Sequence, residues 1–271
     1  MKYKLIAIDL DGTLDNDHKE VDIPTRDALL SAQRQGIRLL LASARPLHGL
    51  FRERDILEMT SYHGLLMAYN GGLISDCSDG AILSSAQMDP EQARQILKML
   101  ESFPVTPILD DGSTFYAADE DAYMVRSECR NNNMPFVQMQ NLSENLFFAP
   151  YKILMSADPV AAKTVQREIA ALLPSGLCIV QTAPFYLEII PGSVNKGAGL
   201  RTVCETVGID LSQTIAFGDS ENDAPMLRVA GVGIAMGNAD DSVKRVADMV
   251  TASNNDNGIA AALKKIRITA E

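Results

Sequence analysis

The first third of the chain alternates short apolar runs with longer segments that carry the signals of helices. Mostly apolar residues fill 4–8, 37–42 and 65–69, and runs of this length that end in turn residues are typical of buried strands. The segments between them, 22–36 and 46–58, are expected to be helices, the first because it opens with an Asp cap and an early Pro. Strands that alternate with helices predict a parallel sheet with helices on its faces.

The order of elements changes after Asn70-Gly71-Gly72, which is a tight-turn signal followed by strand-like segments. A helix followed by two strands is predicted twice beyond this point: over 89–103, 105–109 and 114–118, and again over 158–173, 177–182 and 185–190. The likeness between the two units is one of pattern rather than of residues. It predicts a separate α+β insert.

The first pattern returns from residue 196 onward. A helix is expected over 197–207, a buried strand over 213–217, a helix near 221–230, a short strand over 231–236, and then two further helices. The sequence therefore predicts an α/β protein with a Rossmann-like parallel-sheet core domain, residues 1–81 and 191–271. An α+β domain, residues 82–190, is inserted into that core.

The composition excludes several classes of protein. Among 271 residues, 35 are Asp or Glu and 24 are Lys or Arg, which gives a net charge of −11. An acidic surface repels phosphate backbones and anionic lipid, so neither nucleic acid nor a membrane is expected as a partner. No apolar run approaches the ~20 residues of a membrane span, and the N-terminal apolar stretch is too short for a signal peptide.

The cysteines and histidines have no metal-ligand spacing. The four cysteines lie far apart with no C-x-x-C pair, which favours reduced thiols in a cytoplasmic protein. Any metal must therefore be held by oxygen atoms. The sequence leaves open whether the protein is a monomer or a homodimer.

Four polar segments fall at the ends of predicted parallel strands or at the start of a helix. They are Asp9-Leu10-Asp11-Gly12-Thr13, Ser43-Ala44-Arg45, Asn195-Lys196-Gly197 and Gly218-Asp219-Ser220-Glu221-Asn222-Asp223. The carboxyl ends of strands form the ligand crevice of an open α/β sheet, so we expect these segments to meet there.

The predicted meeting point combines carboxylates with hydrogen-bond donors. Its four carboxylates would repel one another without a cation, and their oxygen atoms suit Mg²⁺: Asp9, Asp11, Asp219 and Asp223. Lys196, the Ser43 hydroxyl and the N–H groups of the turns are the donors. A phosphate dianion approaches carboxylates only where a metal and a Lys offset the charge, so this set predicts a phosphoryl site.

These segments resemble the motifs of a known family. Asp9-Leu10-Asp11-Gly12-Thr13 is similar to the first motif of the haloacid dehalogenase-like superfamily, and residues 218–223 are similar to its fourth. The Cof-type sugar-phosphatase branch is closer still, because it has an Asn-Gly like Asn70-Gly71, a Lys-Gly like Lys196-Gly197 and a stretch like 235–239. The resemblance covers the full length, and in it the insert corresponds to a cap.

The resemblance implies a role for each matching carboxylate. Asp9 would be the nucleophile that becomes an aspartyl phosphate, and Asp11 would be the general acid and base, with its backbone carbonyl a metal ligand. We expect the Asp11 side chain to point away from the metal, where nearby negative charge raises its pKa. Asp9 and Asp219 would supply oxygens to Mg²⁺, and Asp223 would be a further ligand or a support.

The resemblance also implies a set of phosphate-binding groups: the amide of Leu10, Ser43, Ala44, Lys196 and Asn222. Residue 44 departs from the family, in which Gly usually follows a Thr at this point. Ser43-Ala44 keeps a hydroxyl and a small side chain, so we expect the chemistry to be retained. Arg45 is expected to be a structural partner of one of the acids.

The sequence thus predicts a Mg²⁺-dependent phosphatase that hydrolyses small phosphorylated metabolites through an aspartyl phosphate. One alternative is a phosphosugar mutase that uses the same aspartyl phosphate. Another is a non-catalytic protein that senses a phosphorylated metabolite on this fold. Taken singly, Asp-x-Asp-Gly is a turn signal and Lys196 is a solvated helix-start residue, and the four segments in order argue against both interpretations.

Overall fold

In the computed structural model, which describes residues 2–268, the chain forms two units. One contains the residues up to Ser85 together with those from Asn195 onward, and the other is Ala86–Val194. Each unit has its own sheet and its own buried apolar residues. The predicted α/β core with an inserted α+β unit is confirmed.

The first unit is built on an eight-stranded sheet. Its strands are β1 (Leu5–Ile8), β2 (Arg38–Ala42), β3 (Leu65–Ala68), β4 (Leu73–Asp76), β5 (Ile82–Ser85), β12 (Thr214–Gly218), β13 (Val232–Ala235) and β14 (Met249–Val250). Their order is β14-β13-β12-β1-β2-β3-β4-β5, and the pairs are parallel from β14 to β3 and antiparallel beyond it. β5, which lies within the stretch expected to be the insert, pairs with β4 in this sheet.

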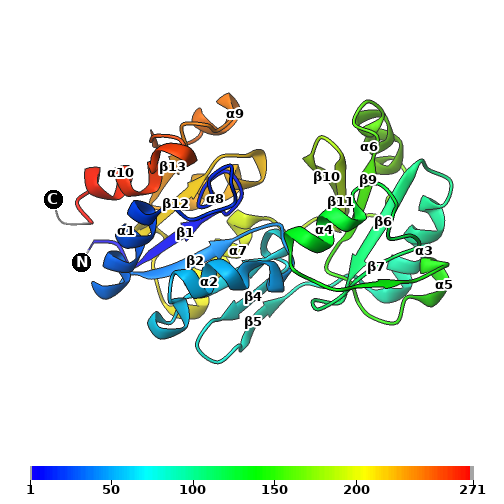
Figure 1. The fold of residues 1–271 in the computed structure, drawn as a ribbon, viewed down its shortest axis with the longest axis horizontal. Helices are drawn as coiled ribbons and strands as arrows, with labels where there is room; N and C mark the ends of the chain where they lie inside the picture. The colour runs from blue at the N-terminus through cyan, green and yellow to red at the C-terminus, as the bar shows by residue number, and fades with distance from the viewer. Residues whose placement is uncertain (1, 269–271) are drawn as a thin grey trace. The chain divides into compact units, whose positions relative to one another are not determined.

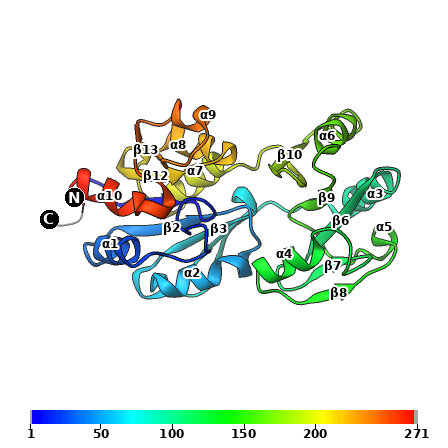
Figure 2. The ribbon, with the colours of Figure 1, turned by 45° about the horizontal axis from the view of Figure 1, so that its top comes forward.

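Helices cover both faces of the first sheet, as Figure 2 shows. The α-helices are α1 (Ile23–Arg34), α2 (Phe51–Ile56), α7 (Lys196–Val207), α8 (Ala224–Val229), α9 (Asp241–Lys244) and α10 (Gly258–Lys265). Leu200 of α7, Leu227 of α8 and Val243 of α9 join one apolar cluster with Leu5 and Leu40 of the sheet. α1 and α2 lie on the opposite face.

Two of the expected helices are interrupted. The segment predicted as one helix over 46–58 is a 3-10 helix, Leu47–Leu50, followed by α2. Gly49 lies inside the 3-10 helix. The segment predicted near 221–230 is a 3-10 helix, Glu221–Asp223, followed by α8, which has a Pro in its first turn. Further 3-10 helices cover Met59–Tyr62, Tyr69–Gly71, Leu211–Gln213 and Asn254–Asp256.

β1 is the point at which the strand order reverses. The chain runs from β1 to β2 and β3 on one side, and from β12 to β13 and β14 on the other (Figure 1). Leu5 pairs in parallel with both Arg38 and Thr214, so the carboxyl ends of β1, β2 and β12 lie next to one another. The ligand crevice of such a sheet lies at this switch point.

The second unit has a six-stranded mixed sheet in the order β10-β11-β9-β6-β7-β8. Its strands are β6 (Val105–Asp110), β7 (Phe115–Ala117), β8 (Phe136–Gln138), β9 (Ile153–Ala157), β10 (Leu177–Ala183) and β11 (Tyr186–Pro191), and its helices are α3 (Pro90–Leu100), α4 (Val125–Asn131), α5 (Leu142–Asn145) and α6 (Ala162–Ala170). The two helix–strand–strand units are present as α3–β6–β7 and α6–β10–β11. The elements α4, β8, α5 and β9 lie between them.

Alternating side chains divide the second sheet between two apolar clusters. Ile153 and Met155 of β9 pack with residues of α3, α5 and α6. Leu154 of the same strand packs with Val125 of α4. The unit therefore contains its own core on both faces of its sheet.

The sequence predicts reduced cysteines and no membrane-spanning segment. All four cysteines are free, two of them buried and two half-buried. Over the residues that the structure describes, no helix has both the length and the apolar character needed to cross a bilayer.

Gly197 is required where α7 packs against α8. A Cβ atom at this position would lie 2.5 Å from the backbone oxygen of Pro225. Gly197→Ala should therefore lower the free energy of unfolding by about 1–3 kcal/mol through overpacking, measured by denaturant titration. Arg201→Ala, on the exposed side of the same helix, is the control and should change it by less than about 0.5 kcal/mol. Equal stability of the two variants would contradict the close packing.

Candidate active site

The loop after β1 brings Asp9 and Asp219 together. Asp9 is buried at the end of β1, and Asp219 follows β12, the neighbouring strand. Gly12, with φ +82°, adopts a conformation that side chains disfavour, and a Cβ there would lie 2.5 Å from a carboxylate oxygen of Asp219. The Thr13 hydroxyl donates to Asp219 Oδ1 at 2.7 Å. The motif Asp-x-Asp-Gly-Thr is thus shaped around the carboxylate of Asp219.

Lys196 lies between two of the carboxylates. It is the first residue of α7, whose cap is the Asn195 side chain, an acceptor from the Ala198 N–H at 2.9 Å. Its Nζ donates to Asp9 Oδ1 at 2.5 Å and to Asp223 Oδ1 at 2.6 Å, and its side chain is 0% exposed. Burial disfavours the ammonium charge, but Asp223 and Asp9 outweigh burial and hold the pKa of Lys196 above its ordinary value.

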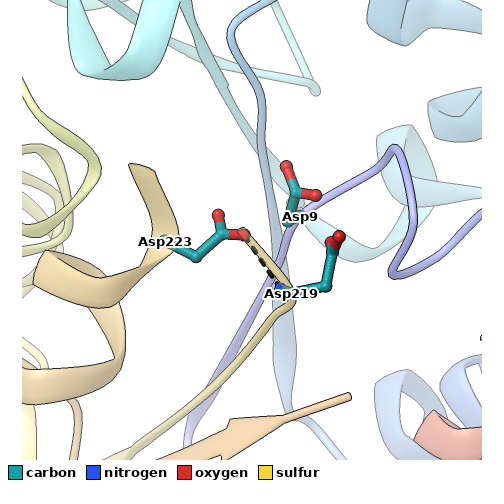
Figure 3. Close-up of side chains that lie close together, drawn as sticks. All are labelled: Asp9, Asp219 and Asp223. Atoms are coloured by element: carbon teal, nitrogen blue, oxygen red, sulfur yellow. Dashed lines mark hydrogen bonds between the residues drawn. The ribbon is translucent and has the colours of Figure 1, made fainter. Parts of the chain in front are cut away.

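Three carboxylates form a group that could hold a metal ion. Asp9, Asp219 and Asp223 each offer an oxygen atom, and these atoms lie within 4.8 Å of one another (Figure 3). Burial and the charge of Asp223 raise the pKa of Asp9 well above its usual range, and burial raises that of Asp219 to about 6. Crowded carboxylates with raised pKa values fit a divalent cation, which would offset their repulsion.

Asp223 is also a structural acceptor. Its Oδ2 accepts hydrogen bonds from the backbone N–H groups of Asp219 and Ser220, both at 3.0 Å, and the first of these is the dashed line in Figure 3. Its Oδ1 accepts from Lys196. Both oxygens of Asp223 are therefore used within the protein, and the side chain fixes the backbone that carries Asp219.

Asp11 differs from the expectation for it. Its carboxylate is directed to Arg45, whose Nε donates to Oδ2 at 2.8 Å and whose Nη2 donates to Oδ1 at 2.5 Å, and Lys19 Nζ also donates to Oδ1. Burial favours the neutral acid, but the hydrogen bonds and charges of Arg45 and Lys19 prevail and lower the pKa of Asp11 to about 2. The expected rise in the pKa of Asp11 is wrong for this arrangement, because cations rather than anions surround the carboxylate.

The expected phosphate-binding residues lie on the same edge of the sheet. Ser43 is buried directly after β2, where its N–H donates to the Met67 carbonyl at 2.8 Å. Ala44 follows it and is half-buried. Leu10 is fully buried, and its carbonyl accepts from the N–H groups of the turn that follows, including that of Asp15.

The side chain of Asn222 is held by Asn70, a residue predicted to lie in a turn. Its Nδ2 donates to Asn70 Oδ1 at 2.9 Å, and its Oδ1 accepts from the Ser220 hydroxyl at 2.8 Å. Asn70 has a φ of +57°, and a Cβ on the next residue, Gly71, would lie 3.0 Å from the Asn195 carbonyl. The turn 70–72 therefore packs on the start of α7 and orients Asn222.

A second charged group, which sequence reasoning did not identify, lies behind Arg45. It contains Lys19, Asp15 of the first loop, and Arg52 and Glu53 of α2. Asp15 and Glu53 are buried. No motif marks these residues, because an acid seven residues after a strand and an Arg-Glu pair in a helix are ordinary surface patterns.

Comparison with known proteins agrees with this geometry. A family model described as haloacid dehalogenase-like hydrolase matches residues 6–263. The phosphatase YwpJ of Bacillus subtilis is 30% identical, with 97% of this chain and 99% of that protein covered. The 5-amino-6-(5-phospho-D-ribitylamino)uracil phosphatase YitU of the same organism is also 30% identical, with 97% of each covered.

Solved structures share the whole fold. A haloacid dehalogenase-like hydrolase from Bacteroides thetaiotaomicron superposes with a TM-score of 0.91 at 31% identity, covering 97% of this chain and 99% of that one. The subclass IIB sugar phosphatase BT4131 superposes with a TM-score of 0.81 at 23% identity, covering 98% and 100%, and this likeness concerns the fold.

Asp219→Asn should stabilise the metal-free protein near neutral pH. A carboxyl whose pKa is raised by folding favours the folded state when protonated, so that contribution is lost as the pH rises through about 6. Ionised Asp219 is then a cost of about 3 kcal/mol, which Asn does not carry. Thermal unfolding in a chelator measures this gain.

The same variant should also lose the stabilisation that added Mg²⁺ gives the parent, because a ligand carboxylate is gone. Asp27→Asn, an exposed acid on α1, is the control and should alter neither quantity. An Asp219→Asn protein that is less stable than the parent in chelator and still stabilised by Mg²⁺ would rule out this role of Asp219.

Proposed function

The chain belongs to the haloacid dehalogenase-like hydrolases and is a phosphatase of small phosphorylated metabolites, and we propose that it works with Mg²⁺ by transferring the phosphoryl group to Asp9. The observation that carries the proposal is the position of Asp9. It lies at the switch point of the sheet, with Lys196 on one of its oxygens and Asp219 beside it.

Asp9 is proposed as the nucleophile. The hydrogen bond from the buried Lys196 fixes the orientation of its carboxylate, and a fixed carboxylate needs no reorganisation before it attacks phosphorus. An oxygen of Asp9 would form a bond to phosphorus as the bond to the leaving oxygen breaks. Water would then attack the aspartyl phosphate and release phosphate.

Asp9, Asp219 and the backbone carbonyl of Asp11 are proposed to hold Mg²⁺. The ion would supply positive charge that lets a phosphate dianion approach these carboxylates. Asp223 supports the site by holding the backbone of Asp219 and Ser220, since both of its oxygens already accept hydrogen bonds from the protein.

The groups proposed to bind the phosphoryl oxygens are the Ser43 hydroxyl, the amides of Leu10 and Ala44, Lys196 and Asn222. Ser43 and Lys196 are buried, and the Asn222 amide is oriented by Asn70. Donors that are fixed in this way stabilise charge that develops in the transition state.

Asp11 is proposed as the general acid and base. Its carboxylate is ionised while Arg45 holds it, so it would leave that cation and take up a proton from solvent before it gives one to the leaving oxygen as the aspartyl phosphate forms. It would then take a proton from the attacking water. The unit Ala86–Val194 is proposed to be the cap that selects the leaving group, because the residues proposed for chemistry all lie outside it. The cytoplasmic location stays a prediction, and the oligomeric state stays open between monomer and homodimer.

Metal removal is the first test of this proposal. Hydrolysis of 4-nitrophenyl phosphate should stop in excess chelator and return with Mg²⁺, while Ca²⁺ should support it poorly because its looser coordination misplaces the nucleophile. Full activity after exhaustive chelation would contradict the use of a metal. Release of 4-nitrophenolate is the measurement.

Lys196→Met tests the role of the buried ammonium. Turnover should fall about 10²–10³-fold, the usual effect of removing one fixed donor from a developing charge. Lys264→Met, an exposed position on α10, is the control and should retain parental turnover. Circular dichroism of the variant separates loss of catalysis from loss of fold. Turnover within a few-fold of the parent would show that Lys196 has been misassigned.

A further inference from the structure

The carboxylate of Asp11 is fully engaged by cations. Arg45 binds both of its oxygens, at 2.8 and 2.5 Å, and Lys19 binds one of them. A side chain that exchanges a proton with a leaving oxygen must come within hydrogen-bond distance of that oxygen. Asp11 must therefore release at least part of the pair with Arg45 during the reaction proposed above.

Arg45 would lose its main anion in that step. Its side chain is only 13% exposed, so water replaces a lost carboxylate poorly, and an uncompensated buried charge is strongly disfavoured. The Gly49 carbonyl accepts from its Nη1 at 3.3 Å, and the buried acids Asp15 and Glu53 also lie near its guanidinium. A second anion close to the guanidinium would solve the problem.

Asp15 is placed to be that anion. Its Oδ2 lies 3.9 Å from Nη2 of Arg45, the same nitrogen that donates to Asp11. A shift of about 1 Å would turn this distance into a charge-assisted hydrogen bond. The Asp15 side chain is 0% exposed, and its Oδ1 is buried without a hydrogen-bond partner.

The backbone of Asp15 is fixed where the side chain must act. Its N–H donates to the Leu10 carbonyl at 2.9 Å, and its carbonyl accepts from Asn254 Nδ2 at 3.0 Å. The neighbouring acid Glu53 also has a buried oxygen without a hydrogen-bond partner, Oε2. Nη2 of Arg52 bridges the two acids, because it lies 3.3 Å from Asp15 Oδ2 and 2.5 Å from Glu53 Oε1. The carboxylates behind Arg45 thus keep capacity to accept hydrogen bonds.

We propose that Asp15 is a positioning residue that takes over Arg45 when Asp11 turns to the leaving oxygen. Arg45 would pair with Asp11 in the resting protein and with Asp15 while Asp11 exchanges its proton. The inference rests on the proposed role of Asp11 as the acid and base. It assigns a catalytic purpose to a buried carboxylate that binds neither metal nor phosphate in the proposed site.

The dependence of rate on the leaving group tests this inference. Without the charge of Asp15, Arg45 holds Asp11 more firmly, so a leaving group that needs protonation suffers more than one that leaves unaided. Asp15→Asn should lower kcat for an alkyl phosphate such as glycerol phosphate by about tenfold or more, and kcat for 4-nitrophenyl phosphate by less than about threefold. KM should change little for either substrate.

Matched variants separate this effect from general damage. Glu53→Gln, which removes the other buried acid, should shift the ratio of the two kcat values in the same direction as Asp15→Asn. Asp55→Asn, an exposed acid on the same helix, should leave the ratio at the parental value. An unchanged ratio in both Asp15→Asn and Glu53→Gln would overturn the inference, because a merely structural role lowers both rates alike.

A crystal structure provides a readout that needs no turnover. In the parent protein with Mg²⁺ and orthovanadate, an analogue of the transferring phosphoryl group, Arg45 should lie within hydrogen-bond distance of Asp15, with Asp11 turned away. Arg45 still bound to both oxygens of Asp11 would overturn the inference. Failure of the parent to hydrolyse 4-nitrophenyl phosphate with Mg²⁺ would instead contradict the proposed function, and the crystal structure would still decide the pairing of Arg45.

Discussion

The buried ammonium of Lys196 is the interaction on which the site depends. Asp9 and Asp223 come from segments more than 200 residues apart in the chain, and each would be disfavoured as a buried anion without a cation. One Nζ atom donates to both, so it fixes the end of β1 relative to the turn that precedes α8. The position of that nitrogen depends in turn on Gly197, because the N-terminal turn of α7 reaches this depth only where no side chain meets the Pro225 carbonyl.

Two kinds of carboxylate therefore lie close together in one loop. Burial and the charge of Asp223 raise the pKa of Asp9, whereas the pKa of Asp11 is lowered by two cations. Only one residue separates Asp9 from Asp11 in the chain, but their side chains point to different surroundings. In the metal-free protein these directions are opposite to what the reaction requires, because the attacking carboxylate must be ionised and the acid must hold a proton. A cation beside Asp9 would favour the ionised form of that residue, and Asp11 would gain a proton only after it leaves Arg45 and Lys19.

Much of this arrangement could be predicted from the sequence, and the failures have physical causes. The buried strands were predicted because apolar runs such as 4–8 end in polar residues, and parallel strands bring those residues to one edge. Short elements such as α4 and β8 were missed because they contain too few residues to show a period. The interruption of the helix expected over 46–58 was missed, because the pattern of apolar residues does not reveal what Gly49 costs inside a helix.

The site was predicted less completely than the fold. Residue type and order pointed to Asp9, Lys196 and Asp219, which the structure brings together. The pKa of Asp11 was predicted in the wrong direction because the sign of its shift depends on which charged groups lie within a few ångströms, and Lys19, one of the two cations on its carboxylate, carries no motif. The double use of Asp223 as acceptor for Lys196 and for two backbone N–H groups likewise depends on geometry that spacing does not reveal.

The placement of the second unit also bears on how such proteins diversify. Its ends join β5 and the start of α7, and it has apolar clusters of its own on both faces of its sheet. Mutations within Ala86–Val194 can therefore accumulate without disturbing the core of the other unit, and an altered insert inherits the carboxylates and the lysine unchanged. A duplicated gene could in this way acquire a new preference by drift in one continuous stretch of about a hundred codons, a length in the range of ordinary independent domains.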